Sequence, residues 1–279
     1  MEKKSNFKIG SGSRKGFVSK FQSENPVIEV SEENNDLQIK NIIFNKSSED
    51  MSELIDNSIS LTVTSPPYNI GKESDLNLTD DEYWGLMTKV FRETYRVTKS
   101  GGRVVINVAN LGRKPYIPIA NQFTQLLIEI GFLMRGEIIW QKSKGANANF
   151  AWGSWLSASN PVIRDIHEYC LVFSKNSFKN ESDNKSTITK EEFMESTLSI
   201  WNILPARAKK IGHPAPFPVE LPQKFINLYS FENDIILDPF LGSGTTAIAA
   251  LNSKRSYIGY EINQTYIEIA KNRIKNEAS

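Results

Sequence analysis

The sequence predicts an α/β fold in which helices cover both faces of a mostly parallel sheet. Short apolar stretches rich in β-branched residues alternate with segments whose apolar residues recur at helical spacing, as in repeated β-α-β units. The chain has 279 residues, 39% of them hydrophobic, which is enough for one large domain. Two of the apolar stretches end abruptly, one at a pair of prolines and the other at a glycine-rich turn.

The composition argues against several classes of protein. With one cysteine, Cys170, and two histidines, His167 and His213, the chain offers no disulfide and few ligands for a metal. Cys170 lies in a stretch typical of a buried strand, and we expect His167 to be structural. The N-terminus is polar, and no apolar stretch of about 20 residues is present. We therefore expect a soluble, cytoplasmic protein.

Residues 1–38 differ in amino-acid composition from the rest of the chain. They are rich in polar and charged residues without periodicity, which predicts a mobile N-terminal extension before a domain at 39–279. Residues 1–20 carry six basic side chains against one acidic side chain, a pattern that is most often solvated. The net charge is only +1, so composition alone does not indicate a nucleic-acid-binding protein.

Strands and helices alternate through the first part of the domain. Residues 80–100 have a charged first turn and a helical apolar pattern, and this helix is expected to end at Gly101-Gly102. A second helix begins near residue 117 and is closed by Gly131. Residues 143–165 and 176–199 are mostly small or polar and are expected to be irregular. Strands are predicted at 61–64, 103–109, 136–142 and 167–175.

The last part of the chain contains a glycine turn between a strand and a helix. Residues 242–247 fit the pattern G-x-G-x-x-A, in which glycines permit a tight turn and the alanine permits close helix packing. Glu261 follows at the end of the next strand, about 20 residues later, where an acid can bond the hydroxyls of a ribose. This order favours a site for a nucleoside-containing cofactor over a structural turn. An amphipathic helix closes the chain.

The residues before the glycines favour one cofactor over another. Asp238-Pro239 places a carboxylate where it would repel a pyrophosphate but could bind an ammonium group. S-adenosylmethionine (AdoMet) has an amino acid end and no phosphate, so it fits better than NAD. An NAD-dependent oxidoreductase is the enzymatic alternative.

The other abrupt strand end is Thr64-Ser65-Pro66-Pro67-Tyr68. Two prolines cannot continue a sheet ladder, because neither has an N–H to donate. The strand must end in a stiff loop that presents a hydroxyl, carbonyl groups and an aromatic ring. Taken alone, such a loop is as compatible with a rigid turn as with a site.

Taken together, the motifs resemble those of a known family. The ordered set resembles the DNA amino-methyltransferases that modify exocyclic amines, in their permuted beta group. The resemblance covers about residues 39–275 and implies a Rossmann-like AdoMet-dependent methyltransferase fold with seven strands, one of them antiparallel. The motifs are TSPPY at 64–68, HPAPFP at 213–218, DPFLGSGTT at 238–246 and YIGYE at 257–261.

The resemblance also implies roles for individual residues. By this resemblance, the loop at 65–68 takes part in catalysis, and the segment at 213–218 closes over the cofactor. The residues implied in catalysis are Ser65, Pro66, Pro67 and Tyr68. The residues implied in AdoMet binding are Asp238, Pro239, Phe240, Gly242, Ser243, Gly244, Thr245, Glu261, His213, Ala215 and Phe217.

These residue types suit methyl transfer to an amine. The Ser65 hydroxyl and the Pro66 carbonyl can accept the two amine hydrogens and free the nitrogen lone pair, and the prolines hold that carbonyl in place. Tyr68 offers a ring for a base flipped out of the duplex. In the family, serine at the first position usually accompanies cytosine N4, whereas aspartate or asparagine accompanies adenine N6. Ser65 therefore predicts cytosine N4, with adenine N6 as the alternative.

Residues 143–211 correspond to the family's variable region, which recognises the target sequence. Basic side chains there could neutralise phosphates of double-stranded DNA. For Trp152, packing within a loop is the more frequent role. Methylation of RNA or of a protein amide is a further alternative. A homodimer and a restriction endonuclease for the same site are partners compatible with the resemblance. The candidate DNA-binding residues are Lys144, Trp152, Arg164, Arg207 and Lys209.

Overall fold

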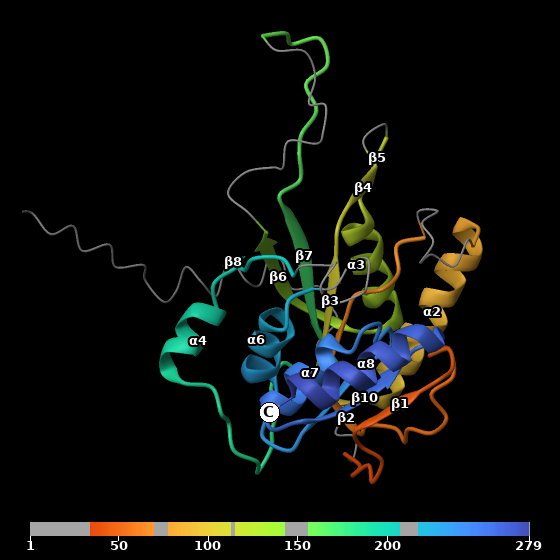
Figure 1. Ribbon diagram of the computed structural model, residues 1–279, viewed down its shortest axis with the longest axis vertical. Helices are drawn as coiled ribbons and strands as arrows, with labels where there is room; N and C mark the ends of the chain where they lie inside the picture. The colour runs from red at the N-terminus through yellow and green to blue at the C-terminus, as the bar shows by residue number, and fades with distance from the viewer. Residues whose placement is uncertain (1–33, 70–77, 113–114, 143–155, 207–216, 279) are drawn as a thin grey trace, which may run out of the picture.

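The computed structural model describes residues 34–69, 78–112, 115–142, 156–206 and 217–278 (Figure 1). Within them, eight strands form one sheet in the order β1-β10-β9-β2-β3-β7-β6-β8, and β4 and β5 form a separate pair. The strands are β1 (Ile42–Phe44), β2 (Ile59–Thr64), β3 (Thr98–Val108), β4 (Leu111–Gly112), β5 (Tyr116–Ile117), β6 (Leu133–Gln141), β7 (His167–Ser174), β8 (Ile200–Asn202), β9 (Ile235–Asp238) and β10 (Ser256–Tyr260). The helices are α2 (Asp80–Val97), α3 (Ile119–Ile130), α4 (Lys190–Ser196), α6 (Glu220–Tyr229), α7 (Thr245–Asn252) and α8 (Gln264–Glu277).

The sheet is parallel except at β7, which runs antiparallel to both of its neighbours, β3 and β6. The predicted α/β fold, with a mostly parallel sheet and one antiparallel strand, is therefore confirmed. The described sheet has one strand more than the seven predicted. The three-residue strand β8 adds to the edge beside β6, where Trp140 pairs with Trp201.

Strands from distant parts of the sequence meet at the centre of the sheet. β2 lies between β3 and β9, and it pairs with β9 through Leu61↔Ile236 and Thr62↔Leu237. Because these strands are parallel, their carboxyl ends lie at the same edge. The proline loop after β2 and the glycine turn after β9 are thus brought side by side, and this position is where open α/β sheets bind ligands.

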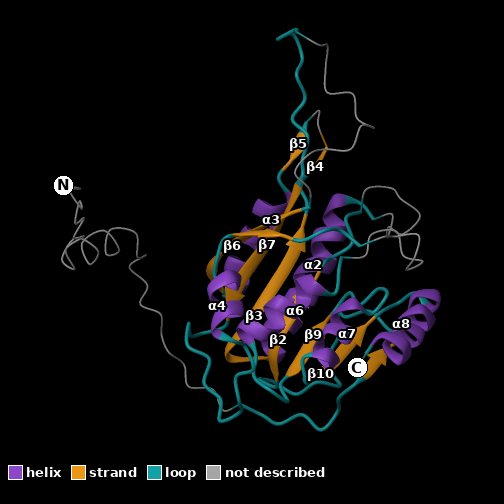
Figure 2. Ribbon diagram, turned by 60° about the vertical axis from the view of Figure 1, so that its left-hand side comes forward, coloured by secondary structure: helices purple, strands orange, loops and turns teal. Residues whose placement is uncertain are grey.

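Helices cover both faces of the sheet (Figure 2). On one face, α6 and α7 pack over a core in which the rings of Phe225 and Trp201 are in tilted contact, with a centroid distance of 4.4 Å. On the other face, α2 and α3 meet through Phe91 and Phe123, whose ring centroids are 5.8 Å apart. Helix α2 begins at a capping box in which Thr79 and Glu82 satisfy each other's backbone amides.

The predicted end of the first helix at Gly101-Gly102 is wrong. Helix α2 ends at Val97, and β3 begins at once and continues through both glycines. The register of β2 against β3 shifts between Ile59 and Leu61, so the extra residues of β3 form a bulge. Gly101 has a φ of 76°, and a Cβ atom there would lie 2.1 Å from the carbonyl oxygen of Lys179. The glycines serve a strand irregularity and not a helix end.

The described end of the predicted extension is packed against the domain. Leu37 is buried in the core, and the Asn35 amide nitrogen donates to the carbonyl oxygen of Asn57 at 2.9 Å. Residues at 35 and 37 therefore contact the domain, and the boundary near residue 38 stays a prediction. Residues 1–33 lie outside the described part of the chain.

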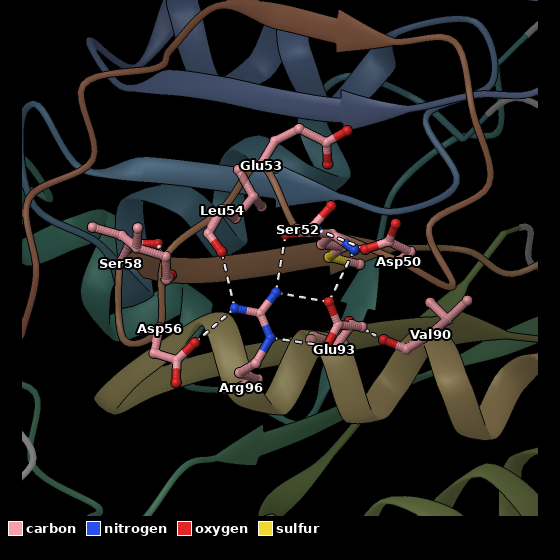
Figure 3. A network of polar contacts seen from close by, with 12 residues as sticks. Asp50, Ser52, Glu53, Leu54, Asp56, Ser58, Val90, Glu93 and Arg96 are labelled. Atoms are coloured by element: carbon pink, nitrogen blue, oxygen red, sulfur yellow. Dashed lines mark hydrogen bonds and ion pairs between the residues drawn. The ribbon is translucent and has the colours of Figure 1, made fainter.

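Arg96 joins α2 to the segment that precedes β2 (Figure 3). Its guanidinium donates to the carboxylates of Glu93 and Asp56, both at 2.7 Å, and to the carbonyl oxygens of Met51 and Leu54. Hydrogen bonds to Glu93 are the largest of several causes that raise the pKa of Arg96, so the charge is permanent. This network fixes the start of β2 against the helix that also supports its end.

Two regions depart from the core of the fold. Helix α4, in the stretch expected to be irregular, begins at a second capping box formed by Thr189 and Glu192. Residues 156–166 and the pair β4–β5 project beyond the end of the sheet (Figures 1 and 2).

Within the described ranges, no helix is long and apolar enough to cross a membrane, and no three His, Cys, Asp or Glu side chains could hold a metal ion together.

Candidate active site

The loop after β2 is held by a hydrogen bond from a neighbouring helix. Pro66 is buried, whereas Ser65 and Pro67 are partly exposed. The hydroxyl of Tyr83, in α2, donates a hydrogen bond of 2.8 Å to the carbonyl oxygen of Pro67. Because both prolines have a fixed φ, this bond restricts the direction of the backbone beside Ser65.

Asn69 closes the loop on its other side. Its backbone has a φ of 48°, a conformation that asparagine tolerates better than most residues. Its side-chain amide donates to the Leu78 carbonyl oxygen at 2.7 Å and accepts from the Leu78 backbone amide at 3.0 Å. The place where the chain leaves this loop is thereby joined to the place where it returns towards α2.

Tyr68 is fixed at both ends of its side chain. Its ring packs against the core under α2 and α3, and its hydroxyl oxygen accepts a hydrogen bond of 2.7 Å from the backbone amide of Ala109. The hydroxyl also shares a hydrogen bond with the Ser65 side chain. Burial, followed by the charge of Glu168, raises the pKa of the Tyr68 hydroxyl, which therefore stays protonated at neutral pH.

Asp238 links the proline loop to the glycine turn. Its Oδ1 accepts from the Thr64 hydroxyl at 2.7 Å and from the Phe240 backbone amide at 3.1 Å, and its Oδ2 accepts from the Thr246 hydroxyl at 2.6 Å. Only 2% of this residue is exposed. Burial raises the pKa of the Asp238 carboxyl to about 6, although all three hydrogen bonds favour the charged form.

The glycine turn needs its glycines for two separate reasons. Gly242 and Gly244 have φ values of 52° and 81°, in the left-handed region that other residues rarely adopt. A Cβ atom on Gly244 would also lie 2.9 Å from the Cβ atom of Ala270, in α8. Below the turn, the Arg273 guanidinium donates to the carbonyl oxygen of Ser243 at 2.9 Å. The last helix therefore supports the turn from underneath.

Glu261 lies directly beside the glycine turn, as expected. One carboxylate oxygen accepts from the Gly242 backbone amide at 2.8 Å, and the other accepts from the Asn263 backbone amide at 2.8 Å. Burial raises the pKa of Glu261, and these two amides oppose that rise. The two oxygens together offer about four lone-pair sites, and the backbone amide of Ile262 is the third donor to them, so the carboxylate can still accept a hydrogen bond from a ligand.

The site is therefore a proline loop and a glycine turn that lie side by side, with an acid beyond the turn. Comparisons with known proteins agree with the family that these motifs resemble. Residues 59–272 match the model of the N6/N4 methyltransferase family, described as DNA methylase. The chain belongs to this family. It is 34% identical over 269 residues to the Type II methyltransferase M.MthZI of Methanothermobacter thermautotrophicus, a match that covers 83% of this chain and 76% of the relative. It is 32% identical over 278 residues to the Type II methyltransferase M.MjaI of Methanocaldococcus jannaschii, covering 84% and 90%.

Solved structures show the same fold as this DNA methylase. TTHA0409 from Thermus thermophilus, solved in complex with S-adenosyl-L-methionine, has a TM-score of 0.69 and 27% identity, covering 85% of this chain and 95% of its own. The PvuII DNA methyltransferase, named as cytosine-N4-specific, has a TM-score of 0.65 and 21% identity, covering 84% and 92%. The second likeness concerns the fold alone.

The remaining predicted residues of this DNA methylase lie in several parts of the chain. Pro239 and Phe240 follow Asp238, and the Pro239 carbonyl oxygen accepts from the Ser48 hydroxyl at 2.9 Å. Phe217 packs against the core beside α6. Arg164 is exposed, in the segment before β7. Thr245 begins α7, and its hydroxyl accepts from Arg273 at 3.1 Å. His213, Ala215, Lys144, Trp152, Arg207 and Lys209 lie outside the described residues.

Sequence reasoning missed several residues that hold the site together. Thr64 and Thr246 bind the two oxygens of Asp238, while Tyr83 and Asn69 restrain the proline loop. A hydroxyl at the last position of a buried apolar strand is a weak signal that could have drawn attention to Thr64. The partners of Tyr83 and Asn69 lie 16 and 9 residues away, so no local pattern reveals them.

Proposed function

We propose that this DNA methylase transfers the methyl group of AdoMet to the N4 amine of a cytosine flipped out of double-stranded DNA. The observation that carries the proposal is the hydrogen bond between Thr64 and Asp238. Thr64 directly precedes Ser65, and Asp238 is the last residue of β9 before the glycine turn. A group bound at the turn would therefore lie next to the residue that would receive the amine.

The residues at the turn fit AdoMet. The Thermus thermophilus neighbour was solved with this compound, which agrees with the cofactor predicted from the sequence. Without side chains, Gly242 and Gly244 allow a ligand close to the backbone, and Glu261 keeps acceptor capacity for ribose hydroxyls. We assign the methionine part to the segment from Asp238 to Thr245. Asp238 makes several hydrogen bonds within the protein, so its main role is to connect the proline loop to the glycine turn. Its contact with the ammonium group of AdoMet remains a prediction.

The proline loop is suited to activate an amine. When bound, AdoMet supplies an electrophilic methyl group. The exocyclic amine of cytosine is a poor nucleophile, because its lone pair is delocalised into the ring. The Ser65 hydroxyl and the Pro66 carbonyl would accept its two hydrogens and so localise the lone pair on nitrogen. Tyr83 and the fixed φ of both prolines restrain this backbone before the substrate arrives, so little reorganisation is needed.

The choice of cytosine depends on Ser65, as in the sequence analysis. A neutral hydroxyl at this position favours cytosine N4, and adenine N6 is the alternative within the same family. Membership in a family of N6 and N4 methylases supports DNA as the substrate and is compatible with either base.

The segments that flank β7 are our candidates for recognising the DNA sequence. β7 itself is an internal strand of the sheet, so the variable region at 143–211 contributes two separate parts, before and after it. Arg164 is exposed in the first part and could neutralise a phosphate. Lys144, Trp152, Arg207 and Lys209 remain predictions in the same role.

The biological setting is also a proposal. M.MthZI and M.MjaI are named Type II methyltransferases, which supports a role in protecting DNA from a restriction endonuclease that acts on the same site. This role places the enzyme in the cytoplasm. A homodimer remains an expectation, which light scattering of the purified protein would test.

One experiment tests the proposed reaction directly. The protein is incubated with diverse duplex DNA and methyl-labelled AdoMet, the modified base is identified by mass spectrometry, and its sites are identified by sequencing. We expect N4-methylcytosine at one short sequence. Ser65→Ala should abolish most of the labelling, whereas Ser52→Ala, at an exposed serine before β2 and outside the candidate recognition region, should not. Labelling of RNA or protein but not DNA would refute the proposal, and N6-methyladenine would refute only the choice of base.

A further inference from the structure

A row of polar residues crosses the sheet beside the proline loop. β2 pairs with β3 through Val63↔Val105 and Thr64↔Ile106, the last pair of this ladder, and Ser65 and Asn107 are the next residues along the two chains. Asn107 pairs in turn with Cys170 in β7. Paired residues of neighbouring strands point to the same face, so Asn107 and Cys170 share a face, and Ser65 follows the end of β2 at the same edge of the sheet.

Two more strands extend the row. Glu168 lies two residues before Cys170 in β7 and pairs with Trp140 in β6, and Lys142 lies two residues after Trp140. Because side chains alternate along a strand, Glu168 and Lys142 share the face of Asn107. The row at this edge therefore runs Ser65, Asn107, Glu168 and Lys142 across four adjacent strand ends.

Contacts between these side chains hold the row in one arrangement. Asn107 Nδ2 donates to Glu168 Oε2 at 2.6 Å, and Lys142 Nζ donates to Glu168 Oε1. The Cys170 thiol donates to Asn107 Oδ1 at 3.3 Å, which fixes the amide with its nitrogen towards Glu168. The Lys142 ammonium also lies 5.1 Å from the centre of the Trp140 ring, a cation–π contact that further restrains it.

The row lies next to the loop that would hold the amine. Tyr68 binds the backbone of Ala109, two residues after Asn107, and the charge of Glu168 is among the causes that raise the pKa of Tyr68. The glycine turn lies on the other side of β2, after β9. A base whose amine meets Ser65 from the side opposite the turn would therefore place its ring over the ends of β3, β7 and β6.

We infer that Asn107 and Lys142, joined through Glu168, bind the ring edge of the target base and that Lys142 is a specificity-determining residue. This inference rests on the proposed function. Both side chains keep N–H donors beyond those used within the row. Next to its amine, cytosine presents two acceptors in succession, the ring nitrogen N3 and the carbonyl oxygen O2. Adenine presents N1 followed by a C–H group, which leaves the second donor without a partner.

The exposure of the residues supports this role over a purely structural ion pair. Asn107 is 5% exposed, the side chain of Glu168 is 12% exposed and that of Lys142 is 34% exposed, so the ammonium end is the accessible end of the row. A partly buried ion pair adds little stability compared with apolar packing, because removing the charges from water offsets their attraction. The row presents donors at the place where the base must be recognised.

Lys142→Met tests the inference. Two duplexes are compared, with either cytosine or adenine at the target position of the site that sequencing defines, and kcat/KM is measured with labelled AdoMet. Loss of one good hydrogen bond to the base should lower kcat/KM for cytosine about 10- to 100-fold and leave that for adenine unchanged. The preference for cytosine should fall by the same factor. Lys142→Arg, which keeps donors at this position, should restore part of it.

Lys224→Met is the matched control. The Lys224 ammonium also lies 5.1 Å from the centre of a tryptophan ring, that of Trp201, but it belongs to α6, outside the row. This variant should keep the wild-type preference. If Lys142→Met leaves the preference unchanged while the wild type forms N4-methylcytosine, the inference alone is overturned, even if total activity falls. If the wild type forms N6-methyladenine, the cytosine assignment of the proposed function fails and the inference fails with it.

Discussion

Thr64 and Asp238 are 174 residues apart in sequence, and a hydrogen bond of 2.7 Å joins their side chains. The bond connects the last residue of β2 to the last residue of β9. The carboxylate is almost fully buried, and Thr246 binds its other oxygen at 2.6 Å. Asp238 therefore holds the start of the proline loop and the start of α7 at a fixed separation.

Thr64→Val should weaken both stability and turnover. Valine has a similar shape but no hydroxyl, so the buried carboxylate loses one donor. We expect the free energy of unfolding to fall by about 1–3 kcal/mol. Displacement of Ser65 should lower kcat about 10- to 100-fold. Urea unfolding and single-turnover kinetics measure the two effects, and Thr64→Ser, which keeps the hydroxyl, should restore both. Normal turnover in the valine variant would contradict the bridging role.

Asp238 should make stability depend on pH in the acidic range. Its pKa is raised from 3.8 to about 6 by burial, so the folded state binds the proton more tightly than the unfolded state. This contribution is fully present below about pH 4 and is lost as the pH rises through 6. The shift corresponds to about 3 kcal/mol at most.

Asp238→Asn isolates that contribution. The variant lacks the titrating group, so the free energy of unfolding of the wild type relative to the variant should decrease between pH 4 and 7. The measurement is urea unfolding across that range. A difference that is constant with pH would show that burial does not raise this pKa in the folded protein. Glu261, whose pKa is also raised, is present in both proteins, and its charge is the last-ranked cause of the Asp238 shift, so the difference reports mainly Asp238.

Tyr83→Phe should lower kcat while leaving AdoMet affinity unchanged. The substitution removes the donor to the Pro67 carbonyl and so loosens the loop, but the glycine turn is not touched. A loss of about 1 kcal/mol in positioning corresponds to roughly fivefold in rate. Tyr95→Phe is the control, because Tyr95 lies in the same helix and its hydroxyl binds Asn176, away from the loop. Equal effects of the two variants would show that only the helix is being perturbed.

Gly244→Ala should lower AdoMet affinity. The new methyl group would clash with Ala270, and the residue would be held at a φ of 81°. Calorimetry should show at least about tenfold weaker binding, which corresponds to strain of about 1–3 kcal/mol. Gly85→Ala, in α2, meets no atom within 4 Å and should stabilise the protein by about 0.5–1 kcal/mol without affecting binding. Normal AdoMet binding by Gly244→Ala would exclude the turn from the cofactor site.

Tyr68 can be separated into ring and hydroxyl. Tyr68→Ala removes the surface proposed for the flipped base, and it should reduce turnover strongly while AdoMet binding stays largely intact. Tyr68→Phe keeps the ring and removes only the contacts to Ala109 and Ser65, so its effect should be smaller. A large loss of AdoMet affinity in Tyr68→Ala would show that the ring belongs to the cofactor site.

The parts of the site that could be predicted from the sequence are those with strong local chemistry. Two prolines must end a strand, and a G-x-G turn before a helix needs its glycines, so the proline loop and the turn were found without structural information. The position of Glu261 followed from its spacing to the turn. The residues that connect these motifs could not be found in this way, because Thr64 meets Asp238 only after β2 pairs with β9.

The errors in the predicted fold have physical causes as well. Gly101-Gly102 fits the end of a helix, but strand pairing uses these residues in a bulge, and tertiary structure overrides the local signal. Helix α4 has only seven residues in a polar stretch, too few for a periodic pattern. Leu37 is a single apolar residue in a polar segment, and its burial depends on the core it meets.

The distance along the chain between β2 and β9 sets the order of events during synthesis. The residues proposed to activate the amine are made first, the turn and the acid proposed to hold the cofactor are made more than 170 residues later, and α8, which supports that turn, follows them. A nascent chain that stops before Glu261 lacks this part of the site. Contacts between such distant segments form slowly, because a long loop must close first. Truncated copies of this protein should therefore be inert towards DNA, and activity should appear only when the last helix has docked.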